Sequence, residues 1–223
     1  MLRWEKKAFL DGASIIIGLD EAGRGPLAGP VVAAAVVLKD KPLKKFSCPR
    51  YRERIDDSKK LLPSQRKRAY QEIYKRSIFG HGIKDNKFID EKNILKAANK
   101  AMEDAANRAI RHYCRLNKKD INKIKNKICL LVDGNMDLKL PYKKVYIVKG
   151  DTKSFSIAAA SIVAKVARDS IMDLFDRAYP CYGFLRHKGY GTRSHLEALE
   201  KHGPCNIHRK TFAPIKFYKD DDC

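Results

Sequence analysis

The 223-residue sequence lacks closely spaced cysteines and long apolar runs. Its six cysteines include no Cys-x-x-Cys pair, so no disulfide framework is indicated and a reducing compartment is expected. The longest apolar run, Val31–Leu38, has the length of a strand and is too short for a membrane span. Residues 1–7 also lack the apolar core of a signal peptide, so we expect a soluble, cytoplasmic protein without membrane contact.

Acidic residues are scarce relative to basic ones. Lys and Arg number 47 and Asp and Glu number 26, which gives a formal net charge of +21. Because contacts with phosphates release counterions, this charge favours a polyanionic partner such as nucleic acid. The charge alone also fits a ribosome-associated basic protein without catalysis. Other sequence features are needed to distinguish such a protein from an enzyme that acts on nucleic acid.

The hydrophobic pattern predicts a mixed α/β protein. Strands are expected at residues 14–19, 31–38, 78–83, 127–132 and 144–148. Helices are expected at residues 63–76, 90–115, 156–179 and 192–203, with Ser64, Asp90 and Thr192 as caps, and polar loops at 39–60 and 118–127. No linker divides the chain, so we expect one domain over residues 14–215, whose residues 180–215 form a small helical C-terminal extension. Residues 1–13 and 216–223 are expected to be short tails.

Acidic residues stand at the ends of three predicted strands. Asp20 and Glu21 follow the first strand, Asp133 follows the fourth, and Asp151 comes shortly after the fifth. Such residues are often only turn formers. Carboxylates brought together by neighbouring strands repel one another unless cations bind, and oxygen ligands suit Mg²⁺ or Mn²⁺. In a chain of charge +21, the repeated pattern favours a metal site for phosphodiester chemistry.

Glycines surround the first acidic pair and a later tyrosine. The sequence Gly23-Arg24-Gly25 precedes a predicted strand rather than a helix, which argues against a dinucleotide-binding turn. These glycines let the backbone approach a ligand closely, and exposed N–H and C=O groups there suit a small polar group such as a sugar hydroxyl. Tyr190 lies between two glycines. It either closes onto the core as a turn aromatic or stacks on a sugar or base.

Hydroxyls and cations mark the predicted helix that starts at Ser156. Ser154, Ser161, Lys165 and Arg168 share one stripe, and a helix N-terminus beside Asp151 is a phosphate-binding arrangement. The alternative is an ordinary solvated face. The segment with Ser58 and Lys59 is likewise either a polar loop or a loop that grips a nucleic-acid backbone. A zinc site is not indicated, because His187, His195, Cys205 and His208 have spacings of 8, 10 and 3 that match no familiar finger.

The run at residues 20–31, Asp-Glu-Ala-Gly-Arg-Gly-Pro-Leu-Ala-Gly-Pro-Val, resembles the signature of type 2 ribonucleases H, the bacterial ribonuclease HII family. Matching segments follow in order at residues 57–61, 132–135, 149–151, 156–169, 187–192 and 207–214. The similarity therefore extends from about residue 14 to residue 214. The residues after the acidic pair favour type 2 over the sister type 3 enzymes.

The resemblance implies a ribonuclease H-like fold, with a central mixed five-stranded sheet flanked by helices. It implies an endoribonuclease that cleaves the RNA strand of RNA–DNA hybrids and nicks 5′ of single ribonucleotides embedded in duplex DNA, as in ribonucleotide excision repair. The implied mechanism is two-metal-ion hydrolysis with Mn²⁺ or Mg²⁺, which leaves a 3′-hydroxyl and a 5′-phosphate. The implied metal-binding and catalytic residues are Asp20, Glu21, Asp133 and Asp151. The implied substrate contacts are Gly23, Arg24, Gly25, Tyr190, Ser58, Lys59, Ser161 and Lys165.

Several points stay open at this stage. The alternative function is a non-catalytic hybrid- or RNA-binding protein with the same fold, although four intact acids argue against a pure binder. A monomer is expected by family resemblance, with a sliding-clamp contact as an open question. The sequence does not choose between Mn²⁺ and Mg²⁺, or between embedded ribonucleotides and long hybrids as the main substrate. It also assigns no role to the basic insert at residues 39–54.

Overall fold

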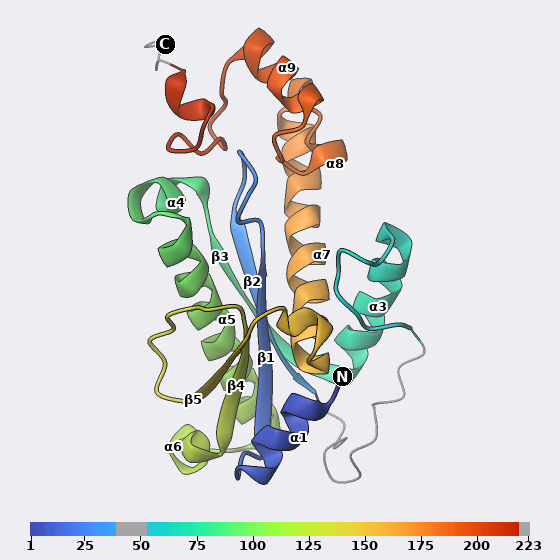
Figure 1. Cartoon of the computed structure of the whole chain (residues 1–223), viewed down its shortest axis with the longest axis vertical. Coiled ribbons are helices and arrows are strands. Elements are labelled where there is room, and N and C mark those ends of the chain that lie inside the picture. The colour runs from blue at the N-terminus through green and yellow to red at the C-terminus, as the bar shows by residue number, and fades with distance from the viewer. Residues whose placement is uncertain (39–52, 219–223) are drawn as a thin grey trace.

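A five-stranded mixed sheet forms the centre of the computed structural model, which describes residues 1–38 and 53–218 (Figure 1). The strand order is β3-β2-β1-β4-β5. Strand β1 pairs antiparallel with β2 and parallel with β4, β2 pairs antiparallel with β3, and β4 pairs parallel with β5. The strands are β1 Ile15–Ala22, β2 Val31–Leu38, β3 Ser77–Lys84, β4 Ile128–Asp133 and β5 Lys143–Ile147. The predicted mixed five-stranded sheet is confirmed.

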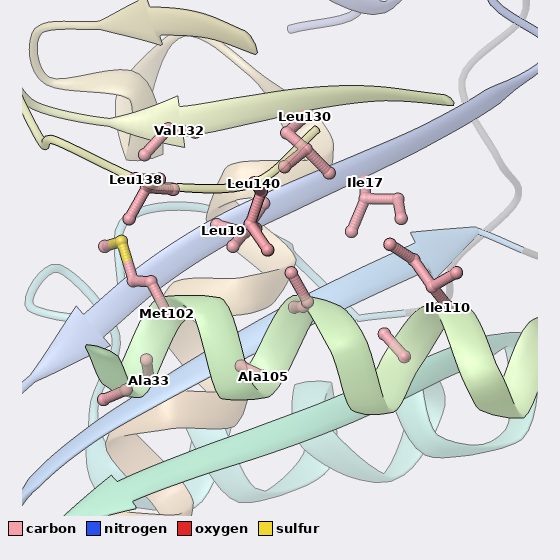
Figure 2. Close-up of a cluster of buried hydrophobic side chains, with 14 of the residues drawn as sticks. Ile17, Leu19, Ala33, Met102, Ala105, Ile110, Leu130, Val132, Leu138 and Leu140 are labelled. Carbon is pink, nitrogen blue, oxygen red and sulfur yellow. The ribbon is translucent and has the colours of Figure 1, made fainter. Parts of the chain in front are cut away.

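Helices cover both faces of this sheet (Figure 1). Helix α5 (Ile94–Asn117) packs on one face, and α7 (Phe155–Ala178) packs on the other together with α3 (Pro63–Arg76). Figure 2 shows Ile17 and Leu19 of β1 facing Met102, Ala105 and Ile110 of α5. The alternation along β1 follows the two-residue period of a strand, because Ile16 contributes instead to the cluster on the opposite face.

Glycines let the helices approach the strands closely. A Cβ at Gly18 in β1 would lie 2.1 Å from the backbone carbon of Ser156 at the start of α7. A Cβ at Gly82 in β3 would lie 1.8 Å from the carbonyl oxygen of Ala101 in α5. Real Cβ atoms essentially never come this close, so these two positions exclude any side chain. The close contact at Gly18 brings the start of α7 next to the strand that carries Asp20 and Glu21.

The remaining elements complete the two ends of the molecule. They are α1 Arg3–Leu10, α4 Asn86–Lys92, α6 Ile121–Ile124, η1 Lys125–Lys127, η2 Gly150–Thr152, η3 Pro180–Tyr182, α8 Phe184–His187, α9 Arg193–His202 and η4 Ile215–Phe217. The C-terminal extension packs on the end of α7 and on the turn before β2 through a separate apolar cluster that includes Leu27, Met172 and Phe184. Among the described residues, no helix is long and apolar enough to cross a membrane.

The predicted helix over residues 90–115 is wrong, because two helices occupy this stretch. Asp85 caps α4 by accepting a hydrogen bond from the N–H of Phe88 (2.8 Å), and Asn93 caps α5 through the N–H of Lys96 (3.0 Å). Asn93 has a φ of 68°, in the left-handed region that Asn tolerates better than most residues, and this breaks the helix. Asp90 lies inside α4, where its carboxylate accepts hydrogen bonds from the N–H groups of residues 210 and 211.

Four smaller expectations are also changed, confirmed or left outside the described residues. Helix α3 is capped at Leu62 rather than Ser64, because Pro63 occupies its first turn. The expected loop at 118–127 contains α6 and η1, with Asp120 as the cap of α6. Thr192 caps α9 as predicted. Of the expected loop at 39–60, residues 39–52 and most of the basic insert lie outside the described residues, whereas residues 53–60 form an irregular segment that ends in a turn at residues 58–60.

Candidate active site

The acidic residues lie on neighbouring elements at one end of the sheet. Asp20 and Glu21 lie within β1 rather than after it, because the β1–β2 ladder continues to the pair Ala22–Val32. The parallel β1–β4 ladder ends at the pair Leu19–Val132, so Asp20 and Asp133 are the next residues along two adjacent strands. Asp151 lies in η2, directly after β5.

These carboxylates interact electrostatically. Burial raises the pKa of Asp20 well above its usual range, and the charges of Glu21 and Asp133 raise it further. Burial also raises the pKa of Glu21, and the nearby Arg24 guanidinium opposes this shift. The pKa of Asp151 is raised by burial and by the charges of Asp57 and Asp133. The fold therefore holds several carboxylates in one place where their negative charges are unfavourable.

This arrangement fits a divalent cation. Glu21 Oε2 is buried and has no hydrogen-bond partner among the described residues. Asp133 Oδ1 accepts a hydrogen bond from the N–H of Gly150 (2.6 Å), which connects β4 to the 3₁₀ turn that carries Asp151. As they stand, no three His, Cys, Asp or Glu side chains in the described part of the chain form a metal-binding group. A cation would nevertheless satisfy the unpartnered oxygen and offset the repulsion between the carboxylates.

The Gly23-Arg24-Gly25 turn begins immediately after β1. Gly23 is buried with a φ of +97°, a conformation that favours glycine, and the added Cβ would collide with the Arg168 side chain at 2.1 Å. Arg24 and Gly25 are exposed. A Cβ at Gly25 would lie 3.8 Å from Cε1 of Tyr190, which places the tyrosine ring beside the turn. Tyr190 is 42% exposed, so its ring is not buried as an ordinary core aromatic.

The residues predicted as phosphate contacts come together only in part. Ser58 and Ser161 are joined by a hydrogen bond of 2.7 Å between their hydroxyls. Lys59 is close enough to Asp151 for its charge to oppose the rise in the pKa of that carboxyl. Lys165 is already paired, because its Nζ donates to Asp169 Oδ1 at 2.7 Å. Three of these four residues thus lie near the carboxylates or one another, and the fourth is neutralised by an ion pair.

The predicted phosphate site at the start of α7 is wrong. Ser154 caps this helix, but the carboxylate of Glu5 from α1 occupies its N-terminus. Glu5 Oε1 accepts hydrogen bonds from the Ser154 hydroxyl (2.7 Å) and from the N–H and hydroxyl of Ser156 (both 2.9 Å). A buried carboxylate therefore supplies the negative charge that a helix N-terminus favours. Arg168 is also buried rather than available to a phosphate, and it binds the carbonyl oxygens of Ala28, Pro30 and Lys188.

Comparison with known proteins shows the family of the chain. The family model for ribonuclease HII matches residues 17–217. The chain belongs to the ribonuclease HII family. The ribonuclease HII of Caldanaerobacter subterraneus subsp. tengcongensis is 48% identical over 211 residues, which cover 94% of this chain and 78% of the relative. The ribonuclease HII of Acholeplasma laidlawii is 46% identical over 216 residues, which cover 96% and 95% of the two chains. The resemblance drawn from the sequence motifs is confirmed.

Solved structures share the fold. The ribonuclease HII in the PCNA complex from Archaeoglobus fulgidus has a TM-score of 0.62 at 24% identity and covers 89% of this chain and 95% of that chain. Bst-RNase HIII in complex with Mn²⁺ has a TM-score of 0.62 at 18% identity and covers 94% and 70%. Cleavage of RNA in RNA–DNA hybrids is the activity of the ribonuclease HII family, and the chain is a ribonuclease of this class.

Two residues that shape this candidate site were not singled out from the sequence. Arg209 is fully buried and donates hydrogen bonds to carbonyl oxygens of the Gly23-Arg24-Gly25 turn. It lies in one of the matching segments, but an arginine among polar residues carries no local sign of burial. Glu5 precedes every matching segment, and nothing in the sequence connects it with Ser154. Both contacts depend on long-range packing.

Proposed function

We propose that this ribonuclease nicks duplex DNA on the 5′ side of single embedded ribonucleotides, as well as cleaving RNA–DNA hybrids. The reaction is a two-metal-ion hydrolysis that leaves a 3′-hydroxyl and a 5′-phosphate. The observation that supports the proposal most directly is the position of the carboxylate group beside the exposed Gly23-Arg24-Gly25 turn. Groups for hydrolysis and groups suited to reading a sugar thus lie next to each other along the chain.

Asp20, Glu21, Asp133 and Asp151 would hold the divalent cations. The Mn²⁺ in the related Bst-RNase HIII structure supports a divalent ion, and either Mn²⁺ or Mg²⁺ suits four carboxylates. When bound, such ions activate a water and stabilise the charge on the leaving oxygen. The buried and unpartnered Glu21 Oε2 is available as a ligand without loss of a hydrogen bond within the described chain. The hydrogen bond from Gly150 orients the Asp133 carboxylate.

The turn and Tyr190 are proposed to select the ribonucleotide. A sugar that rests on the exposed Tyr190 ring beside Gly25 would present its 2′-hydroxyl to the exposed backbone of the turn. A Cβ at Gly25 would already be in van der Waals contact with Cε1 of Tyr190 at 3.8 Å, so glycine keeps the surface of the turn beside the ring free of a side chain. A deoxyribose lacks that hydroxyl and loses the hydrogen bond, which lowers its rate of cleavage.

Ser58, Lys59, Ser161 and Lys165 are proposed to contact phosphates of the bound duplex. The hydroxyl pair formed by Ser58 and Ser161 is the part of this group that the fold holds together most tightly. Lys165 would have to exchange its Asp169 partner for a phosphate oxygen, which is a charge-assisted hydrogen bond of similar strength. The net charge of +21 supports affinity for a polyanionic duplex.

A nicking assay tests the proposal. The substrate is a labelled DNA duplex with one ribonucleotide, and the matched control is the same duplex without it. We expect one 5′-side cut in the presence of Mg²⁺ or Mn²⁺, and no cut of the control. Asp133→Asn should lower the cutting rate by at least about 10²-fold while duplex affinity is retained, because it removes a cation ligand and not a phosphate contact. Full activity in excess EDTA would contradict the proposed mechanism.

A sliding clamp is the protein partner that we propose to test. The Archaeoglobus fulgidus relative forms a complex with PCNA. We further propose that the free ribonuclease is a monomer. Size-exclusion chromatography with and without the sliding clamp tests both points: we expect a monomer alone and co-elution in the mixture. A dimer alone, or separate elution from the clamp, would contradict the respective proposal.

A further inference from the structure

Arg209 is a buried arginine whose guanidinium is bound to backbone carbonyls. Its Nη2 donates to the carbonyl oxygen of Gly23 (2.6 Å) and its Nη1 to that of Arg24 (2.9 Å). Its Nε and Nη2 donate to the carbonyl oxygen of Gly29 at 3.0 and 2.9 Å. Within the described chain, no carboxylate forms a hydrogen bond or ion pair with this guanidinium. The carboxylate of Asp90 acts on this cation only through its charge, so the carbonyl contacts carry the burial of the guanidinium, and that placement needs a reason.

The carbonyl contacts determine which way the turn faces. Both peptide bonds of the Gly23-Arg24-Gly25 turn are trans, and in a trans peptide the C=O and N–H groups point in opposite directions. Since the carbonyls of Gly23 and Arg24 point inward to Arg209, the N–H groups of Arg24 and Gly25 point away from it. Neither N–H donates a hydrogen bond to an acceptor among the described residues. Both residues are exposed.

We propose that Arg209 is a positioning residue for ribonucleotide selection. By binding the carbonyls of the turn from inside, it presents the N–H groups of Arg24 and Gly25 outward as a pair of donors for a sugar hydroxyl or a phosphate oxygen of the substrate. This inference rests on the proposed function, because it explains how the turn is held in a selective conformation.

Several contacts hold Arg209 itself in place. Its N–H donates to the carbonyl of Leu27 (2.8 Å), and the neighbouring residue His208 forms an isolated antiparallel bridge with Ala28. The ring of Phe212 packs on the guanidinium with its centroid 5.0 Å away. The C-terminal extension therefore holds the Arg209 guanidinium in a fixed position against the turn. Lysine cannot replace it, because a single ammonium group lacks the planar array of donors that reaches three carbonyls.

The experiment compares the full-length wild type with Arg209→Lys on three substrates: the single-ribonucleotide duplex, the all-DNA duplex and a continuous RNA–DNA hybrid. We expect kcat on the single-ribonucleotide duplex to fall about 10–100-fold, the size expected when reacting groups are displaced by about 1 Å. Affinity for the all-DNA duplex should change less than about twofold, since Arg209 contacts no phosphate in this arrangement. The loss on the continuous hybrid should be smaller, because neighbouring ribonucleotides offer alternative registers.

Tyr182→Phe is the matched control. It removes one partly buried hydrogen bond of the same C-terminal extension, from the Tyr182 hydroxyl to the carbonyl of Gly203 (2.7 Å), and leaves the turn untouched. Its kcat ratio between the two cleavable substrates should equal that of the wild type. Phe212→Leu is a milder second variant that loosens Arg209 without removing its hydrogen bonds. Its kcat on the single-ribonucleotide duplex should fall about threefold, with a smaller fall on the continuous hybrid. This variant keeps the test valid if Arg209→Lys does not fold.

The outcomes separate the two proposals. If the wild type cleaves hybrids but does not nick the single-ribonucleotide duplex, the proposed function is wrong. The role of Arg209 is then tested on hybrids alone. A lower kcat of Arg209→Lys with an unchanged KM supports a positioning role, and an unchanged kcat contradicts it. If the wild type nicks and a folded Arg209→Lys or Phe212→Leu keeps the wild-type ratio between substrates, Arg209 is only a structural residue and the inference is overturned.

Discussion

Acid should destabilise this ribonuclease through two buried histidines in the C-terminal extension. The N–H of Cys205 donates to His208 Nδ1 (2.9 Å), His208 Nε2 lies 3.0 Å from His195 Nε2, and His195 Nδ1 lies 2.9 Å from the carbonyl oxygen of Tyr190. A donor stands at one end of this chain and an acceptor at the other. Each ring therefore has one protonated and one unprotonated nitrogen, and both rings are neutral.

The size of the effect follows from the pKa values. Burial lowers the pKa of both His195 and His208 to about 4, against an ordinary value of 6.5. Below pH 6.5 these histidines become protonated in the unfolded chain, whereas in the folded chain they stay neutral down to about pH 4. The free energy of unfolding therefore falls as the pH falls from 6.5 to about 4. At pH 5, about 1.5 units below the unfolded pKa, each histidine costs about 2 kcal/mol and the pair about 4 kcal/mol.

Urea unfolding of the wild type and of His208→Gln at pH 7.5 and 5.0 measures this cost. A glutamine amide can still donate to His195 Nε2 but does not titrate, so the wild type should lose about 2 kcal/mol more than the variant over this pH interval. The buried carboxylates Asp20 and Asp151 have raised pKa values and oppose the loss, but they are present in both proteins and cancel in the difference. His202→Gln, at an exposed position, is the matched control and should follow the wild-type profile. Parallel pH profiles for the wild type and His208→Gln would refute the reasoning.

Two further predictions concern the start of α7. Gly18→Ala should lower the free energy of unfolding by about 3 kcal/mol, because its Cβ would lie 2.1 Å from the backbone of Ser156; an unchanged thermal midpoint would contradict the close approach. Glu5→Ala should cost about 1–3 kcal/mol in urea unfolding, since it leaves a buried N–H and two hydroxyls without their acceptor. Glu5→Gln, which keeps an acceptor oxygen, is the control and should lose less; equal losses would point to packing rather than hydrogen bonding.

Local sequence determined the five strands, most of the long helices and the positions of the acidic residues along the chain. Runs of β-branched and small residues predict β2 over the residues it occupies, and Thr192 predicts the start of α9, because period and capping are properties of a few neighbouring residues. The same local reasoning placed Asp133 at the end of β4 and Asp151 shortly after β5. It ended β1 too early, since the continuation to Ala22 depends on pairing with Val32 of another strand.

Only the tertiary structure decided how the residues around the acids are used. Glu5 lies 151 positions before Ser156, and Arg209 lies 186 positions after Gly23, so no local pattern connects either pair. In the sequence, Arg168 shares a helix stripe with Ser161 and Lys165 and has the charge of a phosphate ligand. In the fold it is buried and binds three backbone carbonyls. A buried arginine binds backbone carbonyls that have no other hydrogen-bond partner. Which carbonyls these are depends on how distant segments of the chain pack together. The sequence therefore located the acidic residues, and the fold decided that buried arginines shape the turn beside them.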